Sequence, residues 1–501
     1  MNEANHGEQP GEMAGDYALI VIGAGIAGMN ALEVASHYLP RGARVMLVER
    51  RARSGGMWCD TYDYVHLHQP HPMFTAGDVA WTLGAPPQHL ASKPEILDHF
   101  QRCHARVRDH FALDERFGWE YVAHEEVAVG EGWQVDVQVR PLSDDGGAIA
   151  VRARHCIRAF GFEVPRNPPL ELSSKAVASL SPDAGGLLGV AAVNPDKPVW
   201  VVGGGKTGMD TAHAVLSGWP GREVNLLVGR GTAFMSRDRS FPTGLRRWWG
   251  GQLTLRTFTD LARRFDGDNE QAVFAHFMRH YAVSLDPGFG QYLLGLMSEA
   301  ENAYIRDGIH ECVKDYLVDV VDEDGAPAMV LRSGVRRPVA PGTVFVNCTG
   351  YVLRGASHYE PYVSPHGTVV TVSPNAGIHI LTTFASYFLT HLLYLGQLQT
   401  VPLYEVDHHA LLAANRTAMP FVCMAQILYN LLLILDVVPM SVMRGCGLDF
   451  DRWFPLPRRI AAGMHLERNK ADYVVHCRRT LDRVRERFDI RCGVLEAQPA
   501  A

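Results

Sequence analysis

Two short glycine-rich runs contain the residues of this chain best suited to chemistry. The first is Gly23-Ala24-Gly25-Ile26-Ala27-Gly28. Gly23, Gly25 and Gly28 have the spacing that allows a tight turn, close approach of a pyrophosphate to the backbone, and close packing of a helix on a sheet. The amides of Ile26 and Ala27 begin that helix, where unpaired N–H groups attract phosphate charge. We expect a dinucleotide site here.

An acidic residue supports this interpretation of the first run. Glu49 ends the next apolar run, about 20 residues after the turn, where a carboxylate can accept hydrogen bonds from ribose hydroxyls. Arg50 follows it and is counted with the same site. A purely structural glycine turn is the alternative, and the strand before the run and the helix after it argue against that alternative.

The second run is Gly203-Gly204-Gly205-Lys206-Thr207-Gly208. It has the same context, but the strand after it ends in Gly229-Arg230, where the first unit has a carboxylate. An arginine there suits the 2′-phosphate of NADPH, which a carboxylate would repel. Arg230 could equally be a solvated surface charge, and Arg237 and Arg239 could share the role.

The elements that position these runs predict an α/β fold with two Rossmann-like dinucleotide-binding domains and a mostly helical C-terminal region. Each run stands between two short apolar segments typical of buried parallel strands. Alternation at 133–139 and 149–158 predicts an antiparallel excursion, and Pro165–Pro195 has the composition of a linker. Helical patterns occur near 94–107, 256–282 and 290–318, and 343–347 is one more buried strand. The expected parts are a disordered tail (1–15), a first FAD segment (16–180), an inserted NADPH domain (195–335), a second FAD segment (336–400) and a helical region (401–501).

Composition excludes several classes of protein. The 501 residues are 47% hydrophobic and 20% charged, as in soluble globular domains. The net charge of -7 argues against nucleic acid or an anionic membrane as the main partner. The nine cysteines form no C-x-x-C pair, which favours the reducing cytoplasm. The apolar segments 378–395 and Phe421–Met443 are interrupted by polar residues, so we expect core and no membrane span. For Phe421–Met443 a membrane-surface or subunit contact is the alternative. The helical region leaves a homodimer open.

Further motifs give the chain a family resemblance. Ser54-Gly55-Gly56-Met57-Trp58, the stretch Val65-His66-Leu67-His68-Gln69-Pro70, the second glycine run with Asp210, and Cys348-Thr349-Gly350-Tyr351 follow one another in the sequence. In this order they resemble the class B flavoprotein monooxygenases, which include the flavin-containing monooxygenases, the plant YUCCA enzymes and the Baeyer–Villiger enzymes. The resemblance implies FAD at the first run and NADPH at the second.

The resemblance also implies site residues and a reaction. Cofactor contacts are expected from Gly56, Met57, Trp58, His66, His68, Thr349 and Gly350, with Gly203, Gly205, Lys206, Thr207, Gly208 and Arg230 on the NADPH side. His68 and Gln69 are expected to contact the flavin region or the substrate as catalytic residues. The implied reaction transfers one oxygen atom of dioxygen to nitrogen or sulfur of a small organic substrate, through a flavin hydroperoxide.

One departure keeps other functions open. The family places F-x-G-x-x-x-H between its two nucleotide folds, whereas this chain has Leu172–Ser179 without any of those residues, and its earlier small-Thr-Gly site reads Ala159-Phe160-Gly161. A FAD- and NADPH-dependent reductase that transfers no oxygen is therefore an alternative. A flavin-binding regulator without catalysis is a further one.

Three histidines close together raise the question of a metal. His66, His68 and His71 lie within six residues, and His66 and His68 would share one face of a strand. The family resemblance instead places this segment near the flavin and the substrate, so we expect no metal.

Overall fold

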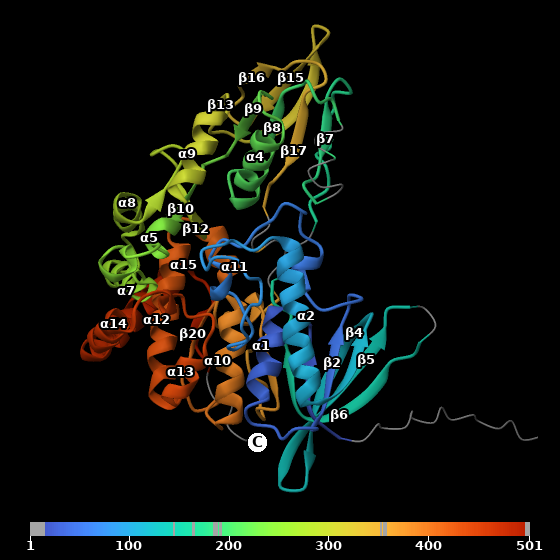
Figure 1. The fold of residues 1–501 in the computed structure, drawn as a ribbon, viewed down its shortest axis with the longest axis vertical. Coiled ribbons are helices and arrows are strands. Elements are labelled where there is room, and N and C mark those ends of the chain that lie inside the picture. The colour runs from blue at the N-terminus through green and yellow to red at the C-terminus, as the bar shows by residue number, and fades with distance from the viewer. Residues whose placement is uncertain are drawn as a thin grey trace, which may run out of the picture.

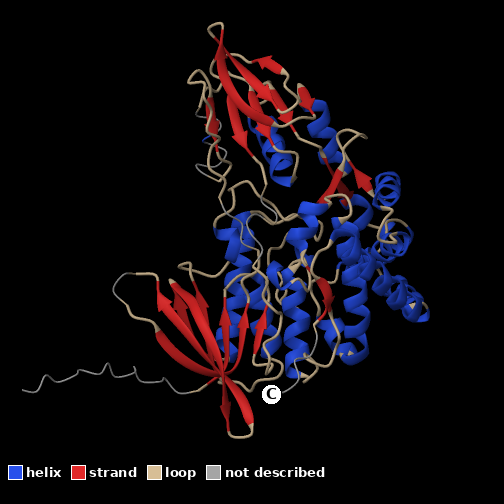
Figure 2. Cartoon of the chain, turned by 180° about the vertical axis from the view of Figure 1, so that it is seen from behind, coloured by secondary structure: helices blue, strands red, loops and turns tan. Residues whose placement is uncertain are grey.

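The protein, described here from a computed structural model, is built on two separate sheets (Figures 1 and 2). The structure describes residues 16–143, 146–162, 166–183, 189, 193–350, 353 and 358–495. The expected tail at 1–15 and Tyr351 of the last motif lie outside these residues. The predicted fold class is confirmed: both sheets have a parallel core with helices against them, and the C-terminal region is mostly helical.

The first sheet has the strand order β3-β2-β1-β6-β5-β4, and β18 also pairs with β6. Its strands are β1 (Tyr17–Ile22), β2 (Arg44–Glu49), β3 (Ala112–Phe117), β4 (Trp119–Val129), β5 (Gly132–Pro141), β6 (Ile149–Arg158) and β18 (Val369–Thr371). β1 is parallel to β2 and β6, whereas β4, β5 and β6 form the expected antiparallel excursion. The central strand β1 is apolar and buried along almost its whole length because helices and strands cover both of its faces.

The second sheet is wholly parallel, with the order β13-β9-β8-β17-β7. Its strands are β7 (Ala178–Leu180), β8 (Val199–Val202), β9 (Val224–Leu227), β13 (Glu311–Val313) and β17 (Val344–Asn347). Two small sheets adjoin it, made of β10 (Thr232–Ser236), β11 (Ala282–Val283) and β12 (Gln291–Met297), and of β14 (Leu317–Glu323), β15 (Ala326–Leu331) and β16 (Arg336–Pro338). In Figure 1 this unit lies above the first one.

Helices flank both sheets and form the C-terminal region. Those of the first unit are α1 (Ile26–Ala35), α2 (Lys93–His110) and α10 (Thr382–Tyr394), with the short 3₁₀ helices η1 (Gly56–Cys59), η2 (His71–Met73) and η3 (Pro374–Ala376). α4 (Lys206–Gly218) and α9 (Glu299–Gly308) lie beside the second sheet. The chain between them also forms α5 (Arg237–Ser240), α6 (Arg246–Trp249), α7 (Thr254–Arg264) and α8 (Glu270–His280), and α7 packs against α12 and α15 of the C-terminal region. The C-terminal region contains α11 (His408–Ala414), α12 (Met419–Val437), α13 (Met440–Gly445), η4 (Phe450–Trp453), α14 (Leu456–Arg468) and α15 (Lys470–Phe488), and β19 (Tyr404–Val406) pairs with β20 (Cys492–Val494).

Three sequence-based expectations differ from the structure. Residues 60–130 contain β3 and β4, which were not expected because few of their side chains are buried and their apolar alternation is weak. The pattern at 290–318 predicted helix, but Gln291–Met297 is a strand parallel to β10, and short apolar runs fit either element. β17 was assigned to the second FAD segment, yet it pairs with β8 and β7; the chain rejoins the first sheet only at β18.

One helix of the described chain, α12, is long and apolar enough to cross a membrane. Of its most apolar window, 67% is buried inside the protein, and α12 packs against α7, α15 and β19. Asn430 in α12 is buried and bonds the backbone of Ile378 and Tyr404. These contacts agree with the expectation that Phe421–Met443 belongs to the core.

The nine cysteines of the chain are all unpaired thiols. Seven of them are buried and two, Cys59 and Cys312, are partly buried. Burial raises the pKa of every one of these thiols, to about 11 for Cys103 and Cys312. Five others reach about 12, namely Cys156, Cys348, Cys446, Cys477 and Cys492.

Candidate active site

The first glycine turn joins β1 to α1. Gly23 has φ +106°, and a side-chain carbon on it would lie 2.5 Å from the carbonyl oxygen of Ala159 on the neighbouring segment. A side-chain carbon on Gly28 would lie 1.8 Å from the Gly23 oxygen, so the helix can lie this close only with glycine there. The first helical hydrogen bond of α1 runs from the Met29 amide to the Gly25 oxygen. The amides of Ile26, Ala27 and Gly28 therefore have no acceptor within the helix, which makes its N-terminus suitable for a phosphate.

The middle glycine of this turn faces another loop of the protein. A side-chain carbon on Gly56 would lie 2.8 Å from the Gly25 Cα, and the Gly55 amide donates to the Ala24 oxygen at 2.9 Å. Glu49 is buried at the end of β2, where its Oε2 accepts from the Ala24 amide at 2.7 Å and its Oε1 from the Arg51 amide at 2.9 Å. Oε1 also accepts from the Arg51 guanidinium at 3.4 Å, so Oε2 is the oxygen with a second lone pair for a ribose hydroxyl. Donors and acceptors of the kind that FAD requires are thus present at this turn.

The second glycine turn joins β8 to α4 and has the same backbone. Gly203 has φ +133°, and side-chain carbons on Gly203 and Gly208 would lie 2.3 Å from the Cys348 oxygen and 2.0 Å from the Gly203 oxygen. Gly205 differs from its counterpart in the first turn. No atom lies within 4 Å of the place where its side chain would begin. The second turn is open at the position where a pyrophosphate must approach.

A cavity of about 870 Å³ lies between the two units. The predicted site residues that line it are Met57, Trp58, His68, Gln69, Gly203, Gly205, Lys206, Thr207, Arg230, Thr349 and Gly350. The C-terminal region closes it with Leu412, Arg416 and Met419. Much of the remaining lining is apolar, including Leu293, Leu294 and Ile380. One cavity therefore joins the end of the first unit's motif loops to the open glycine turn of the second.

Other predicted site residues lie away from this cavity. Gly208 packs α4 on the sheet, and the first glycine turn is in contact with the 54–58 loop through Gly56. Besides His66, the predicted site residues that do not line the cavity are Gly23, Gly25, Ile26, Ala27, Gly28, Glu49, Arg50, Gly56 and Gly208. His66 is exposed, with its Nδ1 3.1 Å from the Tyr64 oxygen. The expectation that His66 and His68 share a strand face is wrong, because only an isolated bridge forms at His66 and the chain turns before His68. His71 is buried against Trp81 and bonds the His89 oxygen, so the three imidazoles have separate surroundings.

A buried network of charges holds the two units together at the cavity. Lys206 forms ion pairs with Asp210 and, at 2.9 Å, with Glu301 of α9. Burial alone would lower the pKa of Lys206, but the two carboxylates outweigh it and raise that pKa. Burial alone would raise the pKa of Glu301, yet Lys206 and Arg237 lower it to about 2. The Lys206 ammonium is therefore neutralised by these two carboxylates and is not free to pair with a phosphate.

The network extends into the loop of the first unit. The Tyr62 hydroxyl donates to Asp210 at 2.8 Å, and Arg237 donates to Glu301 at 2.9 Å and to the backbone oxygen of His68 at 3.3 Å. The pKa of His68 is lowered to about 4 by burial and by the nearby Lys206. His68 therefore presents a neutral imidazole to the cavity. The Arg237 guanidinium is engaged by Glu301 and the His68 oxygen, so it is not available to bind a 2′-phosphate. Arg239 bonds the His280 backbone oxygen instead.

Two residues that sequence reasoning missed, Tyr316 and Arg332, line the same cavity as Arg230. The Tyr316 ring packs on Gly229, where a side-chain carbon would lie 2.7 Å from its Cε1. The Arg332 guanidinium lies 4.1 Å from the centre of that ring. All three side chains line the cavity beside the end of β9. Tyr316 and Arg332 come from the β13 end and the β15–β16 turn, and no local pattern in the sequence connects them with Arg230.

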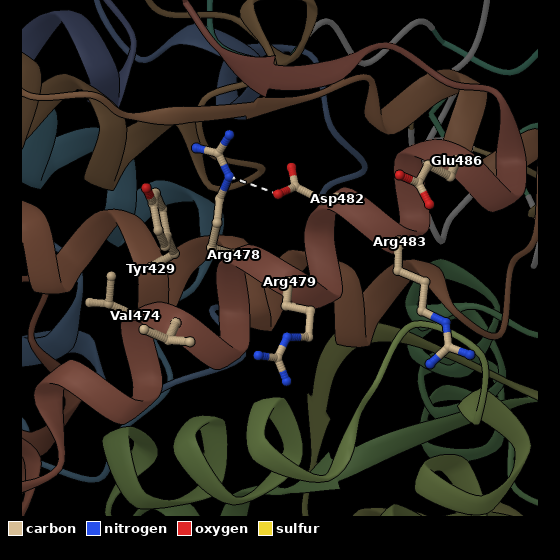
Figure 3. Close-up of a pocket in the computed structure, with 8 residues that line it drawn as sticks. Tyr429, Val474, Arg478, Arg479, Asp482, Arg483 and Glu486 are labelled. Atoms are coloured by element: carbon tan, nitrogen blue, oxygen red, sulfur yellow. Dashed lines mark hydrogen bonds and ion pairs between the residues drawn. The ribbon is translucent and has the colours of Figure 1, made fainter.

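A second hollow, of about 630 Å³, lies along α15 (Figure 3). Its lining is Tyr429, Val474, Val475, Arg478, Arg479, Asp482, Arg483 and Glu486, none of which belongs to a glycine turn or a motif loop. Figure 3 shows Arg478 turned to Asp482, while Arg479 and Arg483 point the other way. With no nucleotide-binding element near it, this hollow is not the candidate active site.

Comparisons with known proteins agree with the two-turn architecture. The sequence profile of the family described as pyridine nucleotide-disulphide oxidoreductase matches residues 17–249, a range that includes both glycine turns. This match agrees with the predicted pair of dinucleotide-binding units. Uncharacterised proteins of Mycobacterium tuberculosis and Mycobacterium bovis are 29% identical over 364 residues, covering 67% of this chain. The chain spans 60% of the length of these relatives.

Solved structures of monooxygenases are also similar to this chain. A flavin-containing monooxygenase from Stenotrophomonas maltophilia is 15% identical with a TM-score of 0.42, covering 75% of this chain and 98% of that one. A mutant cyclohexanone monooxygenase from Rhodococcus sp. Phi1, bound to NADP⁺, is 14% identical with a TM-score of 0.47, covering 76% and 85%.

Proposed function

We propose that this protein is a FAD- and NADPH-dependent monooxygenase that transfers one oxygen atom from dioxygen to a small organic substrate. The observation that carries the proposal is one cavity that reaches from the GG-Met57-Trp58 loop to the open second glycine turn. FAD would belong to the first turn and NADPH to the second. Bound FAD would supply hydride acceptance and dioxygen activation, chemistry that amino-acid side chains lack.

The division of the chain follows from the same proposal. The FAD-binding part would consist of two segments of chain, with the NADPH-binding part inserted between them. The separate sheets support this arrangement, because the chain leaves the first sheet after β6 and rejoins it at β18.

The chain's own residues would bind and orient the two cofactors and the substrate. Amides of Ile26, Ala27 and Gly28 would hold the FAD pyrophosphate, and Glu49 the adenosine ribose. On the other side, Gly205 and Thr207 would leave room for the NADPH pyrophosphate. His68 and Gln69 line the cavity between the two and would contact the substrate or the flavin ring. The neutral imidazole of His68 can accept or donate one hydrogen bond without bringing a charge.

The cavity lining supports an apolar or soft substrate. Leu293, Ile380 and Met419 come from three different elements and make much of the wall apolar, so water is excluded when the space is filled. A nitrogen or sulfur centre in such a molecule is the proposed acceptor of oxygen. The thiols and the reducing compartment that they favour support a cytoplasmic location.

Reduction and reoxidation of the purified yellow protein test this function. NADPH should bleach the flavin anaerobically, and mixing with aerated buffer should give a transient absorbance unlike that of oxidised or reduced flavin. Immediate return of the oxidised spectrum, with peroxide formed in equal amount and no oxygenated product from any amine or sulfide offered, would contradict oxygen transfer. That result would favour the reductase alternative, which the altered Leu172–Ser179 segment motivates. If NADPH does not bleach the flavin, the remaining alternative is a flavin-binding regulator without catalysis.

A second experiment tests the NADPH side. We expect Arg230→Ala and Arg332→Ala each to raise the KM for NADPH by about 10-fold or more, since a charge-assisted hydrogen bond contributes about 1.5–3 kcal/mol. The KM for NADH should change little, because NADH has no 2′-phosphate. Arg479→Ala on α15, remote from the cavity lining, is the matched control. Equal changes in the KM for NADPH and for NADH would show that these arginines do not bind the 2′-phosphate.

A further inference from the structure

Large apolar side chains are exposed to solvent on α6 and α14, two elements that contact each other. Trp249 is 72% exposed and Trp248 52%, and Leu245 just before α6 is 70% exposed. On α14 the exposed apolar side chains are Leu456, Ile460 and Met464. We call these six residues the α6–α14 surface. Isolated exposed apolar residues are ordinary, but two tryptophans with four aliphatic side chains form a patch that requires an explanation.

The exposure is fixed by the packing of these helices. Successive residues of a helix are 100° apart, so Leu456, Ile460 and Met464 follow one another along a single face. Ala462 and Leu466 lie on the opposite face and are buried. Figure 1 shows α14 at the outer edge of the helical region, beyond α12. The apolar face thus points out because the other face is already packed.

Side-chain bonds attach α6 to the start of α14. Arg458 donates to the backbone oxygens of Arg247 at 3.0 Å and Gly251 at 3.2 Å. Arg247 donates to the Trp453 oxygen at 2.7 Å and lies over the buried Trp453 ring. The α6–α14 surface is therefore one preformed unit on the outside of the protein.

The charge around this surface is mainly positive, with Glu467 near the end of α14 as an exposed acidic exception. No aspartate or glutamate occurs from Arg239 to Thr259 or from Trp453 to Leu466, although the whole chain has a net charge of -7. Arg246 is exposed beside the tryptophans. Arg458 and Arg459 follow Leu456 and are partly exposed, and Arg459 forms an ion pair with Asp449 at 3.4 Å. An apolar patch framed by arginines in an acidic protein is complementary to an anionic surface.

We propose that the α6–α14 surface rests on an anionic lipid bilayer, as a reversible contact that does not span it. Indole rings favour the headgroup region, arginines bind lipid phosphates, and aliphatic side chains enter the acyl boundary. A second copy of the chain fits less well. In a two-fold dimer the surface would meet itself, and the exposed Arg246, for which no ion pair is found among the described residues, would lie near its own copy.

Vesicle flotation tests this contact and does not depend on the flavin chemistry. The full-length protein should float with vesicles of phosphatidylcholine and phosphatidylglycerol, and far less with phosphatidylcholine alone. Two variants, Trp248→Ser/Trp249→Ser and Leu456→Ser/Ile460→Ser/Met464→Ser, should each lower the bound fraction at least 10-fold. Val318→Ser, at an equally exposed apolar residue of β14, should bind as the wild type does. Flavin content and melting temperature show that each variant is folded.

Three results would overturn the proposal. The first is no flotation with anionic vesicles, and the second is equal flotation with neutral ones. The third is a wild type that elutes as a dimer and becomes monomeric in the tryptophan variant without any vesicle binding, which would assign the surface to a second copy. Loss of flotation at high salt, by contrast, is expected, because screening weakens arginine–phosphate attraction.

Discussion

The two glycine turns have nearly the same backbone and opposite surroundings. In both, the first glycine has a positive φ and the third allows the helix to lie against the preceding strand. At the middle position, Gly25 lies against Gly56 and the turn is covered, whereas Gly205 faces open cavity. The acidic Glu49 ends the strand beyond the first turn, and Arg230 follows the strand beyond the second.

In the proposed function, this difference would separate a cofactor that stays bound from one that exchanges. A turn held by Gly55, Gly56 and Glu49 cannot release its ligand without moving a loop, which suits a permanently bound flavin. A turn that opens directly onto a large cavity suits a dinucleotide that enters and departs in every catalytic cycle. Four variants test this comparison, from the largest expected effect to the smallest.

Gly56→Ala should have the largest effect on stability and on flavin binding. Its side-chain carbon would meet the Gly25 Cα at 2.8 Å, and the backbone has φ +55°, which side chains rarely tolerate. We expect a loss of about 2–5 kcal/mol in the free energy of unfolding, from overpacking and left-handed strain together. Urea denaturation measures this loss, and the flavin absorbance of the purified variant should be nearly absent. A stable, yellow variant would show that the loop does not hold the first turn.

Gly205→Ala should leave the fold and the flavin intact. Its side-chain carbon would enter open space, so the melting temperature should match the wild type. The same methyl group would occupy the place of the incoming pyrophosphate, and we expect the KM for NADPH to rise about 10-fold or more, a cost of about 1.4 kcal/mol or above. Steady-state kinetics measure this. An unchanged KM would mean that the phosphate does not approach Gly205.

Glu301→Gln should weaken the network that joins the two units. Because the pKa of Glu301 is lowered to about 2 in the folded protein, its stabilisation is complete above its ordinary pKa and is lost as the pH falls toward 2. We expect the variant to lose about 2–4 kcal/mol at pH 7, since Lys206 and Arg237 lose a buried counter-charge. Unfolding measured from pH 7 to pH 3 should show the two proteins converging. Parallel curves would contradict the assigned role.

The smallest effect is expected on the pH profile of kcat/KM when His68 is replaced. Burial lowers its pKa to about 4, so the imidazole stays neutral between pH 5.5 and about 8 and adds no step to the rate profile there. His68→Asn should therefore change the rate but leave the shape of kcat/KM against pH the same in this range. A step near pH 6.5 that disappears in the variant would show that His68 is charged during turnover.

The sequence predicted those parts of the site that depend on local backbone. The glycines, Glu49 and Arg230 could be found because turn, strand end and helix start follow one another within a few residues. Tyr316, Arg332 and Glu301 could not be found, because each reaches the site from an element distant in the sequence. His66 was placed wrongly because an alternating strand was assumed where the chain turns. Strands β3 and β4 were missed because their side chains are only partly buried.

The state of the sulfur atoms has a consequence for an enzyme of this proposed kind. A flavin that handles dioxygen leaks some hydrogen peroxide, and peroxide oxidises thiolates far faster than thiols. With the pKa of all nine cysteines raised, almost no thiolate exists at neutral pH. The chain would thus resist self-inactivation by the by-product of its own turnover, without any scavenger.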